Sequence, residues 1–256
     1  MCDACSQNPL RRLAKESDAE RSARETFLEE FNAVLEEWHS DLLTAIRDGT
    51  VVLATREAAR RTTARVLDQH RDALEAAFAG LWEDGAEAGR AATARRYDLD
   101  VDDELTDRVR RELQEYAADA AEQTGSRMTD DIAEALRDAH SDGLSRDEIA
   151  EILQEDVFPD MRGYEADRAA RTAATGSSAR GAVSSIRDAG APGKQWLVAD
   201  DLRTRDSHDD IDGQVVPVGG KFTTGKGNQA WWPGDPRLPP SDFINCRCAV
   251  APAWDT

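Results

Sequence analysis

Apolar side chains recur every three or four residues through most of the first 190 positions of this 256-residue chain. Because an α-helix completes a turn every 3.6 residues, this spacing gathers the apolar side chains on one face of each helix. Further runs of the same period lie within residues 66–81, 105–116 and 128–136. The pattern therefore predicts a chain built mainly from long amphipathic helices. Its longest run comprises Phe27, Phe31, Val34, Leu35, Trp38, Leu42 and Ile46.

Capping and helix-breaking residues indicate where several of these helices begin and end. Ser145 and Glu148 have the spacing of a capping box, in which each side chain satisfies a backbone N–H at the start of a helix. We expect the helix that they open to end before Pro159, because the residue before a proline disfavours helical geometry. Glycine commonly follows the last turn of a helix, so we also expect helices to end at Gly125 and Gly143.

The composition of the chain changes sharply near residue 190. Seven of the nine prolines, four of the six tryptophans and three of the four lysines lie beyond that point. Short valine-rich runs bounded by glycines follow, and these are typical of short β-strands. We therefore predict an α+β fold with a long, mostly α-helical N-terminal region and a small β-rich C-terminal module. Its segments are an acidic helical region at 1–163, a connecting helix at 164–193 and the β-rich module at 194–256.

Acidic residues outnumber basic ones by 51 to 32, which gives the chain a formal net charge of −19. Proteins that bind nucleic acid through bulk charge carry a basic patch, so the net charge disfavours that class. Only four of the basic residues are lysines. In 1 M salt the Debye length falls to about 3 Å, and a dense carboxylate surface no longer repels itself. We interpret the acid-rich, lysine-poor composition as an adaptation to a halophilic host.

The chain carries no sequence signal for a membrane or for secretion. Its uncharged apolar runs are only a few residues long, well below the roughly 18 that span a bilayer. The first twenty residues lack the apolar stretch of a secretory signal. We therefore expect no membrane partner, and a function inside a cell or inside a particle assembled there.

The four cysteines form two close pairs at opposite ends of the chain. Cys2 and Cys5 make a CxxC, and Cys246 and Cys248 make a CxC. Four cysteines are too few for a disulfide scaffold, so metal ligation or reduced thiols are the better interpretations. His208 with Cys246 and Cys248 offers three ligands for a structural zinc, with the fourth from a carboxylate, water or the N-terminal pair.

Two other interpretations of the polar residues near the C-terminus stand beside the metal site. One is a loop network without chemistry, in which arginines pair with aspartates. The other is a thiol enzyme, with Cys246 or Cys248 as nucleophile, His208 as base and Asp201 or Asp206 orienting it. The first 190 residues hold no glycine-rich phosphate loop, no HExxH and no serine nucleophile elbow. We therefore expect no enzyme and no cofactor other than the candidate zinc.

The last third of the chain contains a series of mostly polar, aromatic and glycine residues at irregular spacing. It comprises Arg171, Thr172, Lys194, Trp196, Asp201, Arg203, Thr204, Arg205, His208, Gly213, Phe222, Pro233, Asp235, Asn245, Cys246, Arg247 and Cys248. In order and spacing this set resembles the Mu-F-like head morphogenesis proteins of tailed viruses, over about residues 166–250. The chain departs from the family at Ala173, where an acidic residue often follows the Arg-Thr pair.

The resemblance implies a minor head protein that acts in capsid assembly and in genome packaging or ejection at or near the portal vertex. Its implied partners are the portal protein, the major capsid protein and genomic double-stranded DNA. The implied location is the virion head, and the host cytoplasm during assembly. Together with the acidity, the resemblance suggests a virus of a halophilic archaeon. The rival interpretation is a Cys/His-dependent enzyme or a toxin-like effector carried in the virion.

Two further expectations concern the module at 194–256. Asp201, Arg203, Arg205 and His208 are expected to hold one loop against the segment Asn245 to Cys248. Any DNA contact is expected from the less acidic tail, where aromatic rings can stack on bases. The alternative is that both tryptophans of that tail fill a small core. The candidate DNA-contacting residues are Lys221, Lys226, Trp231, Trp232 and Arg237.

Overall fold

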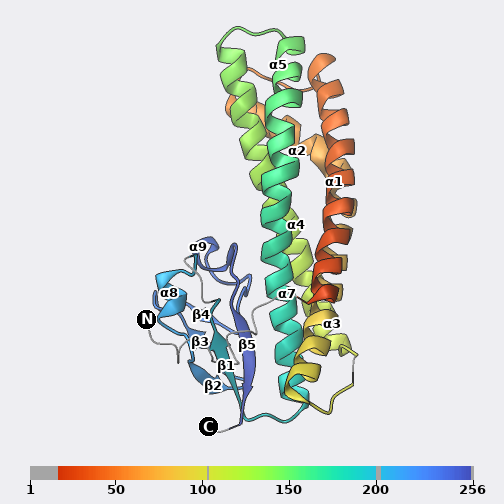
Figure 1. The fold of residues 1–256 in the computed structure, drawn as a ribbon. Helices are drawn as coiled ribbons and strands as arrows, with labels where there is room; N and C mark the ends of the chain where they lie inside the picture. Colours follow the sequence, from red (N-terminus) through yellow and green to blue (C-terminus); the bar gives the residue numbers. More distant parts are fainter. Residues whose placement is uncertain (1–16, 103, 200–202, 255–256) are drawn as a thin grey trace. The chain divides into compact units, whose positions relative to one another are not determined.

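The computed structural model describes residues 17–102, 104–199 and 203–254 (Figure 1). The chain forms two compact units. The unit that we call the helical unit comprises Thr26–Ala79 and Ala117–Ala169. The unit that we call the mixed unit comprises Met1–Glu25, Gly80–Tyr116 and Ala170–Thr256. The division of the chain at residues 163 and 193 stays a prediction.

Long helices account for most of the described chain, and the strands all lie at its C-terminal end (Figure 1). The predicted α+β class is therefore confirmed. No helix among the described residues is long and apolar enough to cross a membrane. The main helices are α1 (Asp18–Arg47), α2 (Arg56–Leu67), α3 (Arg71–Tyr97), α4 (Asp107–Ser141), α5 (Arg146–Ile152) and α7 (Ala166–Asp188). A short 3-10 turn, η2 (Asp68–His70), links α2 to α3.

Aromatic side chains form the core of the helical unit. Phe27 and Phe31 of α1 are at most 1% exposed, and their ring centroids lie 5.1 Å apart. Phe78 of α3 lies 4.9 Å from the Phe27 ring and meets the Phe31 ring edge to face at 5.9 Å. Leu35 and Trp38 continue the same buried face of α1. The apolar stripe predicted from the spacing is thus confirmed as the core-facing side of this helix.

A buried histidine extends this aromatic core. The ring of His39 stacks on Phe158 with centroids 3.7 Å apart and an angle of 4° between the ring planes. Burial, together with the nearby positive charge of Arg162, lowers the pKa of His39 to about 3. The imidazole is therefore neutral at physiological pH and packs as an aromatic ring.

The capping box at Ser145 is confirmed, because its hydroxyl accepts from the Glu148 N–H while the Glu148 carboxylate accepts from the Ser145 N–H. A glycine in the left-handed region, Gly143 at φ +80°, follows the end of α4, also as expected. The expected stop at Gly125 is wrong, since α4 continues through it. A Cβ at Gly125 would lie 2.9 Å from Leu67 Cδ2, so this glycine admits a neighbouring side chain.

The α-helix that begins after Ser145 ends at Ile152, before Pro159 as expected, but the chain stays helical beyond it. Two π-helical turns, η3 (Leu153–Val157) and η4 (Met161–Glu165), flank the single α-turn α6 (Phe158–Asp160) and carry the helical path on to α7. Proline removes one backbone donor and crowds the preceding turn of an α-helix. The chain passes it by widening the turns on either side, a device that sequence spacing does not reveal.

A small antiparallel sheet organises the C-terminal part of the mixed unit (Figure 1). Its central strand, β1 (Gly193–Leu197), pairs with β2 (Val215–Pro217) on one side and β5 (Ala249–Ala253) on the other. A separate two-stranded ribbon joins β3 (Phe222–Thr223) to β4 (Gln229–Ala230). Two single-turn helices, α8 (Asp206–Asp209) and α9 (Pro240–Phe243), lie in the connections. This confirms the β-rich module, with strands shorter than the loops between them.

Glycines set the distance between the helices of the mixed unit. A Cβ at Gly89 of α3 would overlap the backbone of Ser178 on α7, and a Cβ at Gly181 of α7 would overlap the carbonyl of Ala86. The two helices therefore meet at backbone contact. No larger residue fits either position without moving one helix.

Candidate functional site

Three side chains that are far apart in the sequence converge at the edge of the small sheet. His208 Nδ1 lies 3.7 Å from Cys246 Sγ and 3.5 Å from Cys248 Sγ. The three atoms all lie within 4.8 Å of one another. His208 and Cys246 are 1% exposed and Cys248 is 7% exposed. The residues predicted as metal ligands are therefore brought together in the interior of the module.

Local backbone geometry explains this convergence. His208 belongs to α8, where its N–H donates to the Arg205 carbonyl at 2.9 Å. Asn245 adopts a left-handed conformation at φ +56°, which turns the chain after α9. Cys246 and Cys248 follow in an extended segment that leads into β5. Both sulfurs face the imidazole, at 3.7 Å and 3.5 Å from its Nδ1.

Aromatic residues wall the cluster off from solvent. Trp196 of β1 meets the His208 ring nearly edge to face, with centroids 5.3 Å apart. Phe222 of β3 also meets the Trp196 ring nearly edge to face, with centroids 5.2 Å apart. Neither Trp196 nor Phe222 is exposed. The cluster is thus enclosed by the hydrophobic interior of the module.

The two thiols influence one another. Hydrogen bonds from Cys248 and His208 hold the pKa of Cys246 well below its ordinary value despite complete burial. The pKa of Cys248 lies well above its ordinary value because of its bond with Cys246, its burial and the neighbouring negative charge. The pair therefore carries one thiolate more readily than two. A bound cation would change this balance by compensating a second negative charge.

A buried carboxylate lies beside the cluster. Asp242 of α9 is fully buried and accepts from Lys226 Nζ at 2.9 Å and from Asn228 Nδ2 at 2.7 Å. The Ser207 hydroxyl donates to the same carboxylate at 3.4 Å. Burial raises the pKa of Asp242, but the hydrogen bonds from Lys226 and Asn228 more than offset this, and the pKa lies below its ordinary value. Lys226, a candidate DNA-contacting residue, thus has its ammonium paired within the module.

The expected bracing of one loop against the segment 245–248 is seen for part of the set. Arg205 donates to the Ile244 carbonyl, and His208 faces both cysteines. Thr204 donates to the Ala199 carbonyl. Arg203 and Arg247 lie on the two segments themselves. Asp201 lies outside the described residues, as do Cys2 and Cys5.

Helix α7 is tied to the same segment. The Thr172 hydroxyl accepts the Asn245 N–H at 3.1 Å, while Arg171 is exposed on the helix. Further along α7, a Cβ at Gly176 would lie 2.6 Å from the Gly234 carbonyl oxygen. The glycine permits this approach and so positions the turn that carries Gly234. Thr172 and the later turn are therefore parts of one packed assembly.

A buried lysine occupies the other end of the sheet. Lys194 of β1 is 1% exposed, and its Nζ donates to the Trp231 carbonyl at 2.7 Å and lies 5.3 Å from the Phe222 ring centroid. Burial, followed by the positive charges of Arg187 and Arg180, lowers the pKa of Lys194 to about 8. The ammonium is held by the Trp231 carbonyl and by the face of the Phe222 ring, so Lys194 and these two aromatic residues of the motif region form one contact group.

The two adjacent tryptophans have different environments. Trp232 is 4% exposed and lies between the guanidinium groups of Arg180, at 5.3 Å, and Arg237, at 4.9 Å. Trp231 is half-buried, with Lys221 Nζ 4.9 Å from its ring centroid. Trp232 therefore fills the core, whereas Trp231, Lys221 and Arg237 reach the surface. The DNA contact itself stays a prediction.

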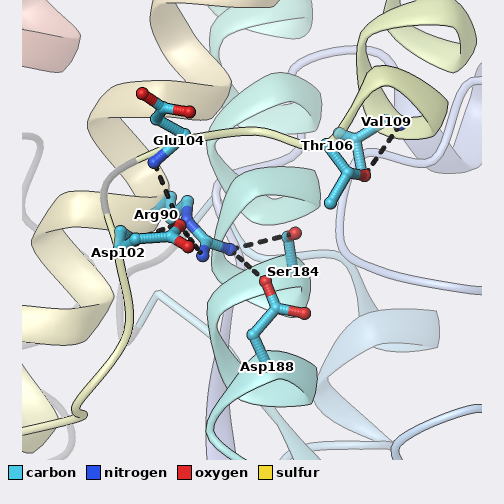
Figure 2. Close-up of polar contacts among 7 residues, drawn as sticks. All are labelled: Arg90, Asp102, Glu104, Thr106, Val109, Ser184 and Asp188. Atoms are coloured by element: carbon cyan, nitrogen blue, oxygen red, sulfur yellow. Dashed lines mark hydrogen bonds and ion pairs between the residues drawn. The ribbon is translucent and has the colours of Figure 1, made fainter.

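Sequence reasoning missed a second polar cluster, which Figure 2 shows around Arg90 of α3. The guanidinium is 2% exposed and donates to Asp102 at 2.9 Å, to Asp188 at 2.6 Å and to Ser184 at 3.2 Å. Arg90 lines a pocket of about 460 Å³, and Glu104 and Thr106 line it as well. Because its donors are engaged, Arg90 ties α3 and α7 to the loop before α4. An isolated arginine among alanines and glycines gave no signal for this role.

Comparisons with known proteins give the following similarities. Residues 130–251 match the model of the family described as Phage Mu protein F like protein. This segment begins within α4, ahead of the resemblance noted in the sequence. Over 132 residues the chain is 28% identical to the Uncharacterized protein YqbB of Bacillus subtilis (strain 168). The alignment covers 49% of this chain and 42% of that protein, so the chain spans less than half of its relative. No solved structure matches the chain.

Proposed function

We propose that this chain, whose residues 130–251 belong to the family of Phage Mu protein F like proteins, is a minor head protein of a tailed virus. It acts in head assembly and in genome packaging or ejection at or near the portal vertex. The proposal rests on one observation: the family model matches residues 130–251, and this segment contains the whole motif from Arg171 to Cys248. Its partners in this role are the portal protein, the major capsid protein and the viral genome.

The arrangement of the motif residues supports a structural role. Asp235 of the motif and Asp242, which precedes its last four residues, are fully buried, and each accepts several hydrogen bonds within the module. Thr172 and Arg205 bond backbone groups of the segment 244–245. Polar residues that bond one another in the interior specify one packed arrangement. One specified arrangement of the module suits a component of a protein shell.

The burial of the thiols argues against the thiol-enzyme interpretation. A nucleophilic cysteine must reach its substrate, and reactive cysteines are partly exposed. Cys246 and Cys248 are at most 7% exposed, and Trp196 packs against the His208 ring beside them. Labelling of the native protein with a thiol reagent near neutral pH is expected to be slow at both positions. Fast labelling at Cys246 would favour the enzyme.

The composition supports a halophilic archaeon as the host. With a net charge of −19, the chain repels itself at low ionic strength, and this repulsion is screened in concentrated salt. The free energy of unfolding is therefore expected to rise steadily as KCl is increased into the molar range. A stability that is unchanged between dilute and molar KCl would contradict this part of the proposal.

The portal position can be tested by cross-linking. Purified particles are treated with a carboxyl- or lysine-reactive cross-linker, and the linked peptides are identified by mass spectrometry. We expect more links between this chain and the portal protein than the abundance of the portal relative to the major capsid protein would give by chance. Links to the capsid protein in proportion to its abundance, with none to the portal, would exclude the portal position.

A further inference from the structure

The two cysteine sulfurs share one histidine nitrogen, and that nitrogen can bond only one of them at a time. A neutral imidazole nitrogen without a proton has one lone pair and accepts one hydrogen bond. Cys246 Sγ and Cys248 Sγ nevertheless lie at nearly equal distances from His208 Nδ1, 3.7 Å and 3.5 Å. The other ring nitrogen, Nε2, has no hydrogen-bond partner among the described residues. The ring is thus oriented so that Nδ1 alone faces the pair of sulfurs.

These distances agree with the edges of a tetrahedral metal site. Zinc binds cysteine sulfur at about 2.3 Å and histidine nitrogen at about 2.0–2.1 Å. With tetrahedral angles, these bond lengths place a sulfur and a nitrogen ligand about 3.6 Å apart. The two sulfur–nitrogen distances in the cluster differ from this value by about 0.1 Å. Both sulfur–nitrogen edges of such a site are therefore already present, and the two sulfurs lie within 4.8 Å of each other.

We propose that His208 Nδ1, Cys246 Sγ and Cys248 Sγ bind one Zn²⁺ ion, which holds the C-terminal module together. Two thiolates and an imidazole are soft ligands that select zinc over magnesium or calcium. The burial of all three residues assigns the ion a structural role. Among the described residues no fourth His, Cys, Asp or Glu joins the cluster, so we assign the fourth position to a small oxygen ligand such as water. This proposal concerns the stability of the module and does not depend on the function proposed above.

The position of the cluster explains what the ion contributes. His208 precedes the cysteines by 38 and 40 residues, and the chain between them consists largely of loops and strands of two or three residues. Small modules of this kind lack a hydrophobic core large enough for independent stability. A metal that joins α8 to the segment before β5 closes this long loop. Binding of the metal is then coupled to folding of the module.

Metal analysis of the full-length protein tests the site. The chain is produced with added ZnSO₄, purified in concentrated salt without chelator, and its zinc is measured by plasma mass spectrometry. We expect one zinc per chain, lost to background in the double variant Cys246→Ser/Cys248→Ser. The matched control, Cys2→Ser/Cys5→Ser, should keep its zinc. A wild-type protein without zinc would overturn the proposal, and so would loss of zinc from the control.

X-ray absorption of the wild-type protein covers the case in which the cysteine variant does not fold. The zinc edge of the loaded protein is expected to show two sulfur ligands at about 2.3 Å and two nitrogen or oxygen ligands at about 2.0–2.1 Å. An imidazole signature should accompany the lighter ligands. Any other number of sulfur ligands would overturn the assignment of these three residues.

Discussion

Aromatic rings separate the helices of the helical unit, whereas glycines bring the helices of the mixed unit into backbone contact. Helix α3 takes part in both kinds of packing. Within the helical unit it contributes Phe78 to a cluster with Phe27 and Phe31. Within the mixed unit it contributes Gly89, which lies against the backbone of Ser178. One helix thus changes its packing along its length because its side chains change from large to small.

The two units also differ in how polar groups are placed. The ion pairs of the helical unit include exposed ones such as Arg61–Glu57, whose side chains are 64% and 67% exposed. In the mixed unit, Asp235 and Asp242 are fully buried and hydrogen-bonded. The helical unit also buries the Glu165 carboxylate, which pairs with Arg127 at 3.2 Å and with Arg168. The mixed unit depends also on a connected set of polar contacts, which tolerates fewer substitutions.

The largest effect is expected from the aromatic core of the helical unit. Replacing Phe31, which is fully buried, by alanine leaves a cavity and is expected to lower the free energy of unfolding by about 3–5 kcal/mol. Urea denaturation followed by circular dichroism measures the change. Tyr164→Ala is the control, because this aromatic side chain is 60% exposed and should cost less than about 1 kcal/mol. Similar losses for both variants would contradict the assigned core.

The backbone contact of the mixed unit should be sensitive to a single methyl group. Gly181→Ala places a Cβ against the Ala86 carbonyl, and overpacking of this kind costs about 1–3 kcal/mol. Gly163→Ala is the matched control, because a Cβ there meets nothing within 4 Å. Alanine has the higher helix propensity, so the control should be neutral or more stable by up to about 1 kcal/mol. If Gly181→Ala is stabilised like the control, the close approach of α3 and α7 is wrong.

Acid should weaken the helical unit through His39. Its pKa is about 3 in the folded state and about 6.5 when unfolded, so acidification favours the unfolded chain. The stability that depends on the neutral ring is complete above pH 6.5 and is lost as the pH falls toward 3. From pH 7 to pH 5 this loss amounts to about 2 kcal/mol. Between pH 7 and pH 5, the unfolding free energy of the His39→Leu variant should therefore fall by about 2 kcal/mol less than that of the wild-type protein. Equal falls in the two proteins would contradict the burial of the ring.

The smallest effects separate buried from exposed ion pairs. Lys226→Met removes one partner of the buried Asp242 carboxylate and is expected to cost about 1–2 kcal/mol, since Lys226 itself is half exposed. Arg61→Met in the helical unit removes an exposed partner of Glu57 and should cost less than about 0.5 kcal/mol. Thermal unfolding at one salt concentration compares them. A larger loss for Arg61→Met would reverse the contrast between the units.

Periodicity predicted the parts of this fold that depend on local sequence. The stripe on α1 and the capping box at Ser145 follow from spacing alone, and the structure contains both. The continuation of helices through Gly125 and past Pro159 did not follow from local signals. Gly125 is placed by its neighbour Leu67, and Pro159 is accommodated by wider turns on both sides. Such outcomes are decided by tertiary contacts that no short window contains.

The candidate site was predictable in its members but not in its geometry. The CxC pair and His208 could be identified from residue types, while the choice of Nδ1 depends on how α8 presents the ring. The different environments of Trp231 and Trp232 were left open by the sequence and depend on the arginines around them. Arg90 gave no signal, because its partners Asp102 and Asp188 lie on separate segments.

Quantification of this chain in virus particles tests its proposed role most directly. Purified particles are emptied of DNA by osmotic shock, and the protein is measured by mass spectrometry in intact particles, emptied heads and released material. We predict a few copies per particle, retained in the emptied heads. Absence from intact particles would contradict the assignment as a head component, and release with the DNA would contradict a fixed position at the portal vertex.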